Sequence, residues 1–373
     1  MRSVLISLVL CSITCCVIAQ NYNSIFYRDH NISASDSNDL YLDIENANIF
    51  KNNEYFNYIT QGYTLIGYII NPRLTYYPFS RARIDAGIHL LKYSGLDNFT
   101  RATPIFTFQY KACKGIDIVM GTLYGSLNHR LIEPVYRFEG YMENNIENGM
   151  QLLIDKNRFR TDVWLSWEKF IFTGDPFREE FTIGTSSEIF LNDNNKKISL
   201  SIPVQTLVFH KGGQITSSQD KLSTLTNTVT GIRIKYLTGI KYPEQVGING
   251  YYVIYEDLSP IKLQKYSDGD ALYPDLFFKI RNSFLHFGYW YAEEYIAPGG
   301  EPVFQSISQV YASYWEKNRE LLTAKFIYNK NISRDISLGL RFEFYYDIIN
   351  NIRDFSYGFH IVFNRRSYLE EIK

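Results

Sequence analysis

The stretch from Ile336 to Asn364, ISLGLRFEFYYDIINNIRDFSYGFHIVFN, alternates apolar and polar residues on both sides of a polar turn. Before the turn, one face carries Ile336, Leu338, Leu340, Phe342, Phe344 and Tyr346, and the other carries Ser337, Gly339, Arg341, Glu343 and Tyr345. After the turn, the two faces are Phe355, Tyr357, Phe359, Ile361 and Phe363 against Ser356, Gly358, His360, Val362 and Asn364. Because successive side chains of a strand point to opposite sides, this period of two predicts a β-hairpin. The apolar face fits either the core of a soluble sandwich or the lipid around a membrane barrel.

The same two faces recur through most of the chain, which favours the barrel. Further strands are predicted at 64–77, 81–93, 103–111, 116–125, 150–155, 158–170, 181–191, 197–210, 229–237, 251–255, 272–281, 284–295, 305–315 and 321–328. So many strands without a domain break are unusual for one sandwich and ordinary for an outer-membrane sheet, whose closure satisfies the backbone in lipid. We therefore expect an all-β fold over residues 61–364, a closed antiparallel transmembrane β-barrel of about 14–16 strands. The final hairpin is expected to close against 64–77, with Phe363 at the membrane edge.

The two ends of the chain differ from the predicted barrel. Residues 1–19 have the charged start, short apolar run and small residues (Val17, Ala19) of a cleaved signal peptide, which leaves Gln20 first. Its removal leaves one of the four cysteines, Cys113, so neither a disulfide nor a cysteine metal site is expected. Residues 20–60 are rich in Asn, Ser and Asp and are predicted as a polar N-terminal arm, either periplasmic or a lumen plug. Residues 365–373 form a charged tail.

Composition excludes several classes of function. The net charge of −1 argues against a nucleic-acid partner, which needs a basic surface. The 31 Tyr and 26 Phe suit a membrane protein, because Tyr is enriched where the bilayer meets water. Histidine pairs at metal-binding spacing and glycine-rich phosphate loops are absent, so we predict no cofactor and no metal site.

The polar faces of the predicted strands carry charged residues, which we expect to face the lumen. They are Arg81, Arg83, Asp85, His89, Arg158, Arg160, Asp162, Glu168, Lys279, Arg281, Arg341, Glu343 and His360. Opposed basic and acidic walls would select polar solutes by their field. The same residues would also serve as structural charges that pair across strands or meet water.

An enzyme site has one weak candidate in the sequence. His129 lies close to Glu133 in sequence, and Ser166 lies in the Trp-rich stretch that ends at Glu168. Barrel hydrolases use Ser and His on neighbouring lipid-facing strands to attack acyl esters. Here the His-x-Ser strand pattern is absent, and Ser166 shares the Arg/Asp face, so hydrolysis is the least favoured interpretation.

The signal ending in Ala19-Gln20, the Asn- and Tyr-rich loops and the alternating strands over 60–364 resemble outer-membrane β-barrels of the Bacteroidota type, with a general similarity to porins. The resemblance implies export to the outer membrane of a Gram-negative bacterium, contact with outer-membrane lipid and use of the barrel-insertion machinery. Such barrels usually end on an aromatic residue, whereas here the charged tail follows Phe363. The function expected first is a porin-like channel for small polar solutes. The alternatives are an accessory barrel of a surface complex and a lipid-acting hydrolase.

Overall fold

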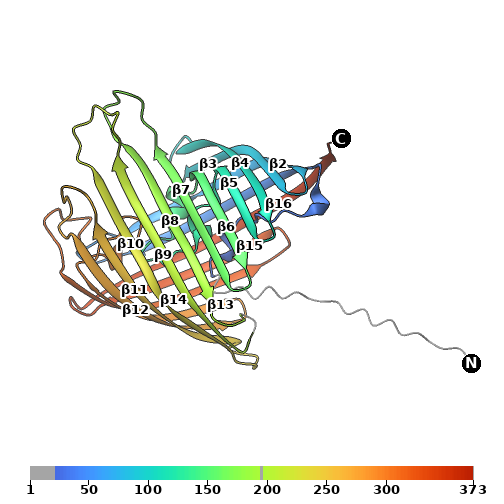
Figure 1. The fold of residues 1–373 in the computed structure, drawn as a ribbon. Helices are drawn as coiled ribbons and strands as arrows, with labels where there is room; N and C mark the ends of the chain where they lie inside the picture. The colour runs from blue at the N-terminus through green and yellow to red at the C-terminus, as the bar shows by residue number, and fades with distance from the viewer. Residues whose placement is uncertain (1–21, 194–195, 373) are drawn as a thin grey trace, which may run out of the picture.

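A computed structural model describes residues 22–193 and 196–372, which form a closed antiparallel barrel of sixteen strands (Figure 1). The strands are β1 (Asp39–Glu54), β2 (Tyr63–Phe79), β3 (Ala82–Tyr93), β4 (Arg101–Cys113), β5 (Ile116–Thr122), β6 (Asn148–Lys156), β7 (Phe159–Lys169), β8 (Glu179–Phe190), β9 (Ile198–Gly212), β10 (Ser223–Leu237), β11 (Gln245–Asp257), β12 (Asp268–Ile280), β13 (Ser283–Glu293), β14 (Asn318–Asn331), β15 (Ile336–Asp347) and β16 (Ile352–Glu371). The predicted fold class and strand number are confirmed. The predicted signal peptide lies outside the described residues.

Helical structure in the described residues is limited to short turns. They are η1 (Ser24–Phe26), η2 (Ala34–Asp36), η3 (Ser126–His129), α1 (Gly140–Glu143) and η4 (Pro302–Phe304). None of these helical segments has the length and apolar character that crossing a bilayer requires.

The barrel closes between β1 and β16, which differs from the predicted closure against 64–77. The strand at 64–77 is β2, and β1 lies between it and β16. The sequence hides β1 because polar and apolar residues are mixed on both of its faces. Asp43 and Glu45 are buried in the lumen, where arginines pair with them, and Asn46 and Asn48 on the outer face bond to each other. Of the described residues, 22–38 precede β1 and are called the arm below, and β16 continues into the predicted tail as far as residue 371.

The alternation in the final hairpin sorts its side chains as predicted. On β15, Phe342 is 50% exposed on the outer face, whereas Arg341 and Glu343 are 2% and 3% exposed inside. On β16, Phe359 is exposed and His360 is buried. An apolar outer surface around a polar interior is the pattern of a barrel surrounded by lipid.

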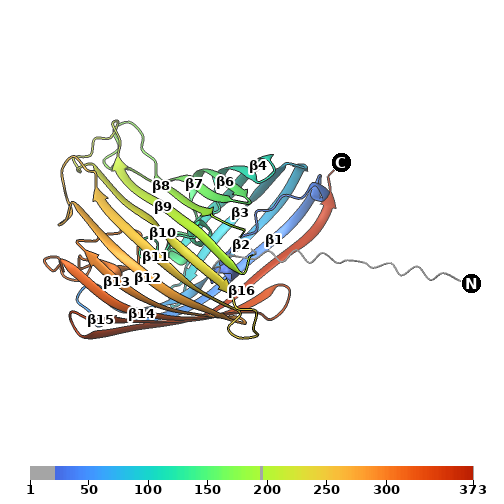
Figure 2. The ribbon, with the colours of Figure 1, turned by 60° about the horizontal axis from the view of Figure 1, so that its bottom comes forward.

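The ends of the strands define which side faces the periplasm. Both described chain ends lie where strands join by short turns, such as those between β2 and β3 and between β6 and β7 (Figure 2). The long connections lie at the other end, foremost residues 123–147 (the β5–β6 loop) and 294–317 (the β13–β14 loop). Outer-membrane barrels have short periplasmic turns and long extracellular loops, so the end with the termini is periplasmic.

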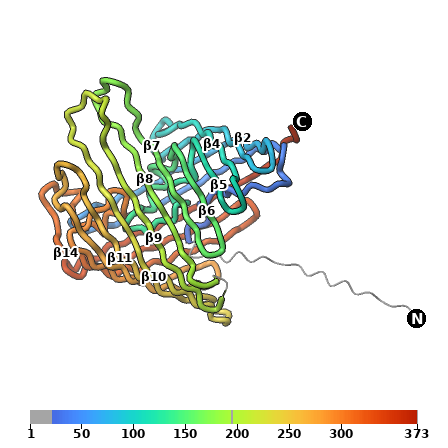
Figure 3. Tube along the Cα trace, in the orientation of Figure 1, coloured from blue at the N-terminus to red at the C-terminus, as the bar shows by residue number. Residues whose placement is uncertain are grey.

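The lumen is filled rather than open. The β5–β6 and β13–β14 loops bond to each other, with the Tyr295 hydroxyl donating to the carbonyl of Pro134 (2.9 Å) and the Arg137 amide donating to the carbonyl of Gly299 (2.8 Å). Trp290 is fully buried and its indole donates to the carbonyl of Phe304 (3.1 Å). The tube view follows the chain along the strands around this lumen in the orientation of Figure 1 (Figure 3). The loops therefore give the lumen a packed core of its own.

Candidate functional site

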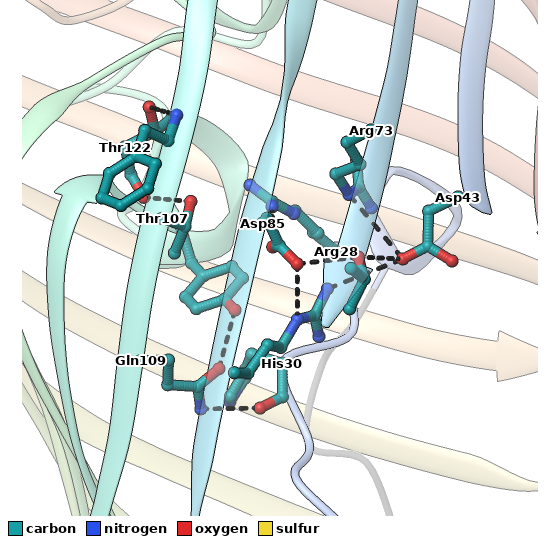
Figure 4. Close-up of polar contacts among 12 residues, drawn as sticks. Arg28, His30, Asp43, Arg73, Asp85, Thr107, Gln109 and Thr122 are labelled. Carbon is teal, nitrogen blue, oxygen red and sulfur yellow. Dashed lines mark hydrogen bonds and ion pairs between the residues drawn. The ribbon is translucent and has the colours of Figure 1, made fainter. Parts of the chain in front are cut away.

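The arm is held in the lumen by a cluster of buried charges (Figure 4). The Asp85 carboxylate accepts from Arg28 of the arm (2.5 Å), from Arg83 (2.9 Å) and from the Thr75 hydroxyl (2.7 Å). The Gln109 amide donates to the carbonyl of His30 (2.8 Å). Because a buried charge is stable only when it is paired and hydrogen-bonded, Asp85 anchors the arm.

The second cluster ties the β5–β6 loop to the opposite wall. Arg341 donates to Glu343 (2.8 Å), and both Arg341 and Lys325 contact Glu133 of the loop. Lys51 on β1 reaches Glu343 (3.1 Å). Glu133, which the sequence placed beside His129, thus serves this ion-pair network.

The structure separates the predicted lumen residues into three groups. Seven are buried inside the barrel: Arg83, Asp85, His89, Asp162, Arg341, Glu343 and His360. Arg160 and Lys279 are half-buried at the periplasmic ends of their strands. The remaining four are exposed: Arg81, Arg158 and Arg281 in β-turns, and Glu168 near the extracellular end of β7.

His129 lies at the centre of a buried cluster of acidic groups. Its Nδ1 is 2.8 Å from Asp162 Oδ2 on β7. Its Nε2 is 3.0 Å from Oε2 of Glu147, which ends the β5–β6 loop that also contains His129. Gln151 donates to the other Asp162 oxygen (2.9 Å), and the Ser126 amide donates to the other Glu147 oxygen (2.7 Å). Burial alone would lower the pKa of His129, but Glu147 and Asp162 outweigh it and raise that pKa to about 10. The imidazole is therefore a cation at neutral pH.

The Trp-rich stretch takes part in this cluster through its first residue. The indole of Trp164 stacks on the His129 ring, with centroids 3.5 Å apart and planes 8° from parallel. Ser166 is buried on the lumen side, as its alternation indicated, but in the described part of the chain it makes no hydrogen bond to His129. The sequence missed Glu147, because it lies in an irregular loop at no characteristic spacing from His129.

A cavity of about 170 Å³, with both polar and apolar groups in its lining, lies beneath the β5–β6 loop, and His129 and Asp162 are among its lining residues. The arm supplies Tyr22 and Tyr27 to one side, and the strand wall supplies residues such as Ser187 and Arg233. These wall positions lie toward the periplasmic ends of their strands. The cavity therefore occupies the periplasmic half of the lumen, with the loop as its roof.

The family model described as Lipid A 3'-O-deacylase-type matches residues 32–372. The chain belongs to the lipid A 3'-O-deacylase-type family. No curated protein matches it.

Among solved structures, this deacylase-type barrel is similar to several outer-membrane proteins. OmpTΔL8 of Vibrio cholerae, a loop deletion mutant, is 10% identical, covers 88% of this chain and 98% of its own, and has a TM-score of 0.49. OprD of Pseudomonas aeruginosa is 8% identical, with 92% and 97% covered and a TM-score of 0.48. The anion-selective porin from Comamonas acidovorans is 10% identical, with 87% and 98% covered and a TM-score of 0.47.

The wall of the deacylase-type barrel is lowest beside the His129 cluster. β5 has 7 residues and β6 has 9, whereas β9 and β10 each have 15 (Figure 1). With a rise of about 3.4 Å per residue and a tilt of about 40°, β5 and β6 are roughly 18 and 23 Å high, below the apolar band of about 25 Å. Glu147 immediately precedes β6, so it lies at this low rim.

Within residues 22–193 and 196–372, no three His, Cys, Asp or Glu side chains are grouped to hold an ion. The chemistry available at the rim is that of an imidazolium between two carboxylates.

Proposed function

We propose that the chain hydrolyses an acyl ester of a lipid A-type glycolipid in the outer leaflet of the outer membrane. The family match over residues 32–372 supports this substrate class. The interpretation that the sequence favoured least thereby becomes the leading proposal.

The single observation that carries the proposal is the position of Glu147, which contacts His129, at the lowest part of the wall. The exposed outer face holds the barrel in lipid, and the rim formed by β5 and β6 lies within the upper part of the apolar band. An ester bond of a membrane lipid lies where the acyl chains meet the headgroup, which is at the same level. An ester brought over this rim would meet Glu147 first and His129 directly behind it.

The two groups supply the acid and the base that ester hydrolysis needs. Glu147 takes a proton from a water molecule as the water oxygen adds to the acyl carbonyl. His129, protonated at neutral pH, then gives its Nε2 proton to the leaving sugar oxygen as the acyl C–O bond breaks. The products are a free fatty acid and a glycolipid with one more hydroxyl. Asp162 and Trp164 hold the ring in place, and the substrate ester must part the His129–Glu147 contact.

The experiment measures deacylation by the purified barrel in vesicles that contain lipid A. Mass spectrometry should show the loss of an acyl chain, and His129→Gln should slow this loss by about 10²- to 10⁴-fold. His210→Gln is the matched control, because His210 lies near the extracellular end of β9, bonds Thr224 of β10 (2.9 Å) and takes no part in the His129 cluster, so it should leave the rate unchanged. Unaltered lipid A with the folded wild-type protein would refute the proposal.

Passage of small polar solutes is the second candidate. The cavity of about 170 Å³ favours it, because it gives the periplasmic half of the lumen room for a hydrated solute beside charged side chains. The arm and the two long loops occupy part of the lumen, which argues against a permanently open pore. Planar-bilayer recordings of the wild type and of a variant lacking residues 22–37 test this candidate. A channel closed by the arm should conduct only in the variant, and two silent proteins would reject conduction.

We further propose that export removes residues 1–19. We also propose that the insertion machinery recognises the aromatic outer face of β16, which precedes the charged end of the chain. Sequencing of the mature N-terminus should find Gln20 first. A mature chain that begins elsewhere would reject that cleavage site.

A further inference from the structure

The cavity beneath the β5–β6 loop carries unpaired positive charge. Three arginines line it around Tyr27 of the arm: Arg130 from the end of η3, Arg160 from β7 and Arg233 from β10. The guanidinium of Arg130 lies over the Tyr27 ring, 5.4 Å from its centroid. Burial raises the pKa of Tyr27, and the charges of all three arginines act against that rise.

The three arginines differ in how well the protein satisfies them. Arg233 is paired, with Nη1 3.4 Å from Glu188 and Nε donating to the Tyr251 hydroxyl (3.1 Å). Arg160 Nε is 3.4 Å from Asp155 Oδ2, an ion pair that lacks hydrogen-bond geometry. Arg130 has neither a hydrogen bond nor an ion pair from its side chain to any described residue. After burial, the nearby Arg160 is the main cause that lowers the pKa of Arg130.

The acidic groups of the same lining have partners elsewhere. Asp162 binds His129, Glu133 binds Lys325 and Arg341, Glu188 binds Ser201 and Arg233, Asp275 binds Asn249, and Asp117 accepts from Gln109. The remaining one, Asp155, is 68% exposed at the periplasmic edge beside Arg160. None of these carboxylates in the described lining forms an ion pair with Arg130.

We propose that this cavity binds a phosphate group between Arg130 and Arg160, with entry from the periplasmic side past Asp155. Two guanidinium groups that face one cavity repel each other until an anion lies between them, and their planar forks match phosphate oxygens in pairs. Ser186 and the Tyr27 hydroxyl offer further donors in the same lining. The volume of about 170 Å³ is several times what a water molecule needs, so a phosphate group fits with some of its hydration. This site is additional to the proposed hydrolysis and does not depend on it.

The test is isothermal titration of the detergent-solubilised full chain with inorganic phosphate and, separately, with a short-chain phosphatidic acid. Arg130→Gln and Arg160→Gln should each weaken binding by about ten- to a hundredfold, because each removes a charged hydrogen-bond donor. Arg158→Gln is the matched control on the same hairpin, since Arg158 lies exposed in the turn and should leave the affinity unchanged.

The outcomes distinguish the source of the phosphate. Binding of both probes identifies a site for free phosphate groups, and binding of phosphatidic acid alone identifies a lipid headgroup. Arg130→Lys, which keeps the charge without the fork, should bind with intermediate affinity, and unboiled gel migration verifies that each variant is folded. The proposal is overturned if the folded wild type binds neither probe, or if Arg130→Gln binds as tightly as the wild type. Neither result bears on ester hydrolysis, which is measured on a different substrate.

Discussion

Replacement of Asp85 by alanine should release the arm and destabilise the barrel. Asp85 is fully buried and accepts from Arg28, Arg83 and Thr75, so its removal leaves two buried guanidinium groups without their closest anion. Breaking a buried ion pair from one side costs roughly 3–5 kcal/mol. Asp43 remains 3.8 Å from Arg83 and offsets part of this cost, so we expect a loss of about 3 kcal/mol, near the lower end of that range.

Two assays measure this loss. Urea unfolding of the barrel in detergent gives the free energy, where about 3 kcal/mol is roughly a 150-fold change in the unfolding equilibrium. Trypsin reports the arm itself, because Arg28 becomes a cleavage site once it leaves Asp85. Asp335→Ala is the control: its pair with Arg365 is surface-exposed, and such pairs contribute only about 0–1 kcal/mol. If Asp85→Ala unfolds like this control and Arg28 stays uncut, Asp85 does not anchor the arm.

Two further predictions concern the loop and the lipid face. Glu147 and Asp162 raise the pKa of His129 from 6.5 to about 10, so the stability that this ion cluster gives the β5–β6 loop is fully present below pH 6.5, falls as the pH rises and is lost above about 10. Hydrogen exchange of the loop should therefore accelerate across that range. An equal pH response in His129→Gln would contradict the role of His129. Phe342→Arg places a charge on the lipid face in the middle of β15 and should lower the free energy of unfolding, measured in vesicles, by about 2–4 kcal/mol. Ile336→Arg, at the periplasmic end of the same strand, should lower it by only about 0–1 kcal/mol. Equal losses would mean that this face does not contact lipid.

The strands that the sequence revealed are those with one uniformly apolar face. The final hairpin is the clearest, because each outer residue from Leu338 to Phe344 is apolar and each inner one is small, charged or tyrosine. β1 escaped prediction because Asn46 and Asn48 occupy its outer face and bond to each other there. A period of two also cannot show where a strand ends, so Arg81, Arg158 and Arg281 were placed in the lumen although they lie in turns.

The filling of the lumen depends on contacts between distant segments and leaves no local pattern. Tyr295 reaches Pro134 across 161 residues of chain, and Arg28 reaches Asp85 across 57. The sequence could single out His129 and the Trp164 stretch, because histidine and tryptophan are rare here. It could not supply Glu147, which comes to His129 only when the loop folds into the barrel.

Ester hydrolysis at the low rim is tested most directly by the fate of the water oxygen. The wild-type barrel and His129→Gln are incubated with lipid A vesicles in water enriched in ¹⁸O, and the released fatty acid is analysed by mass spectrometry. Hydrolysis at this site predicts free fatty acid that carries one solvent oxygen, and a release that is strongly reduced in His129→Gln. Lipid A that keeps all its acyl chains, or labelled fatty acid released equally fast by His129→Gln, would contradict it.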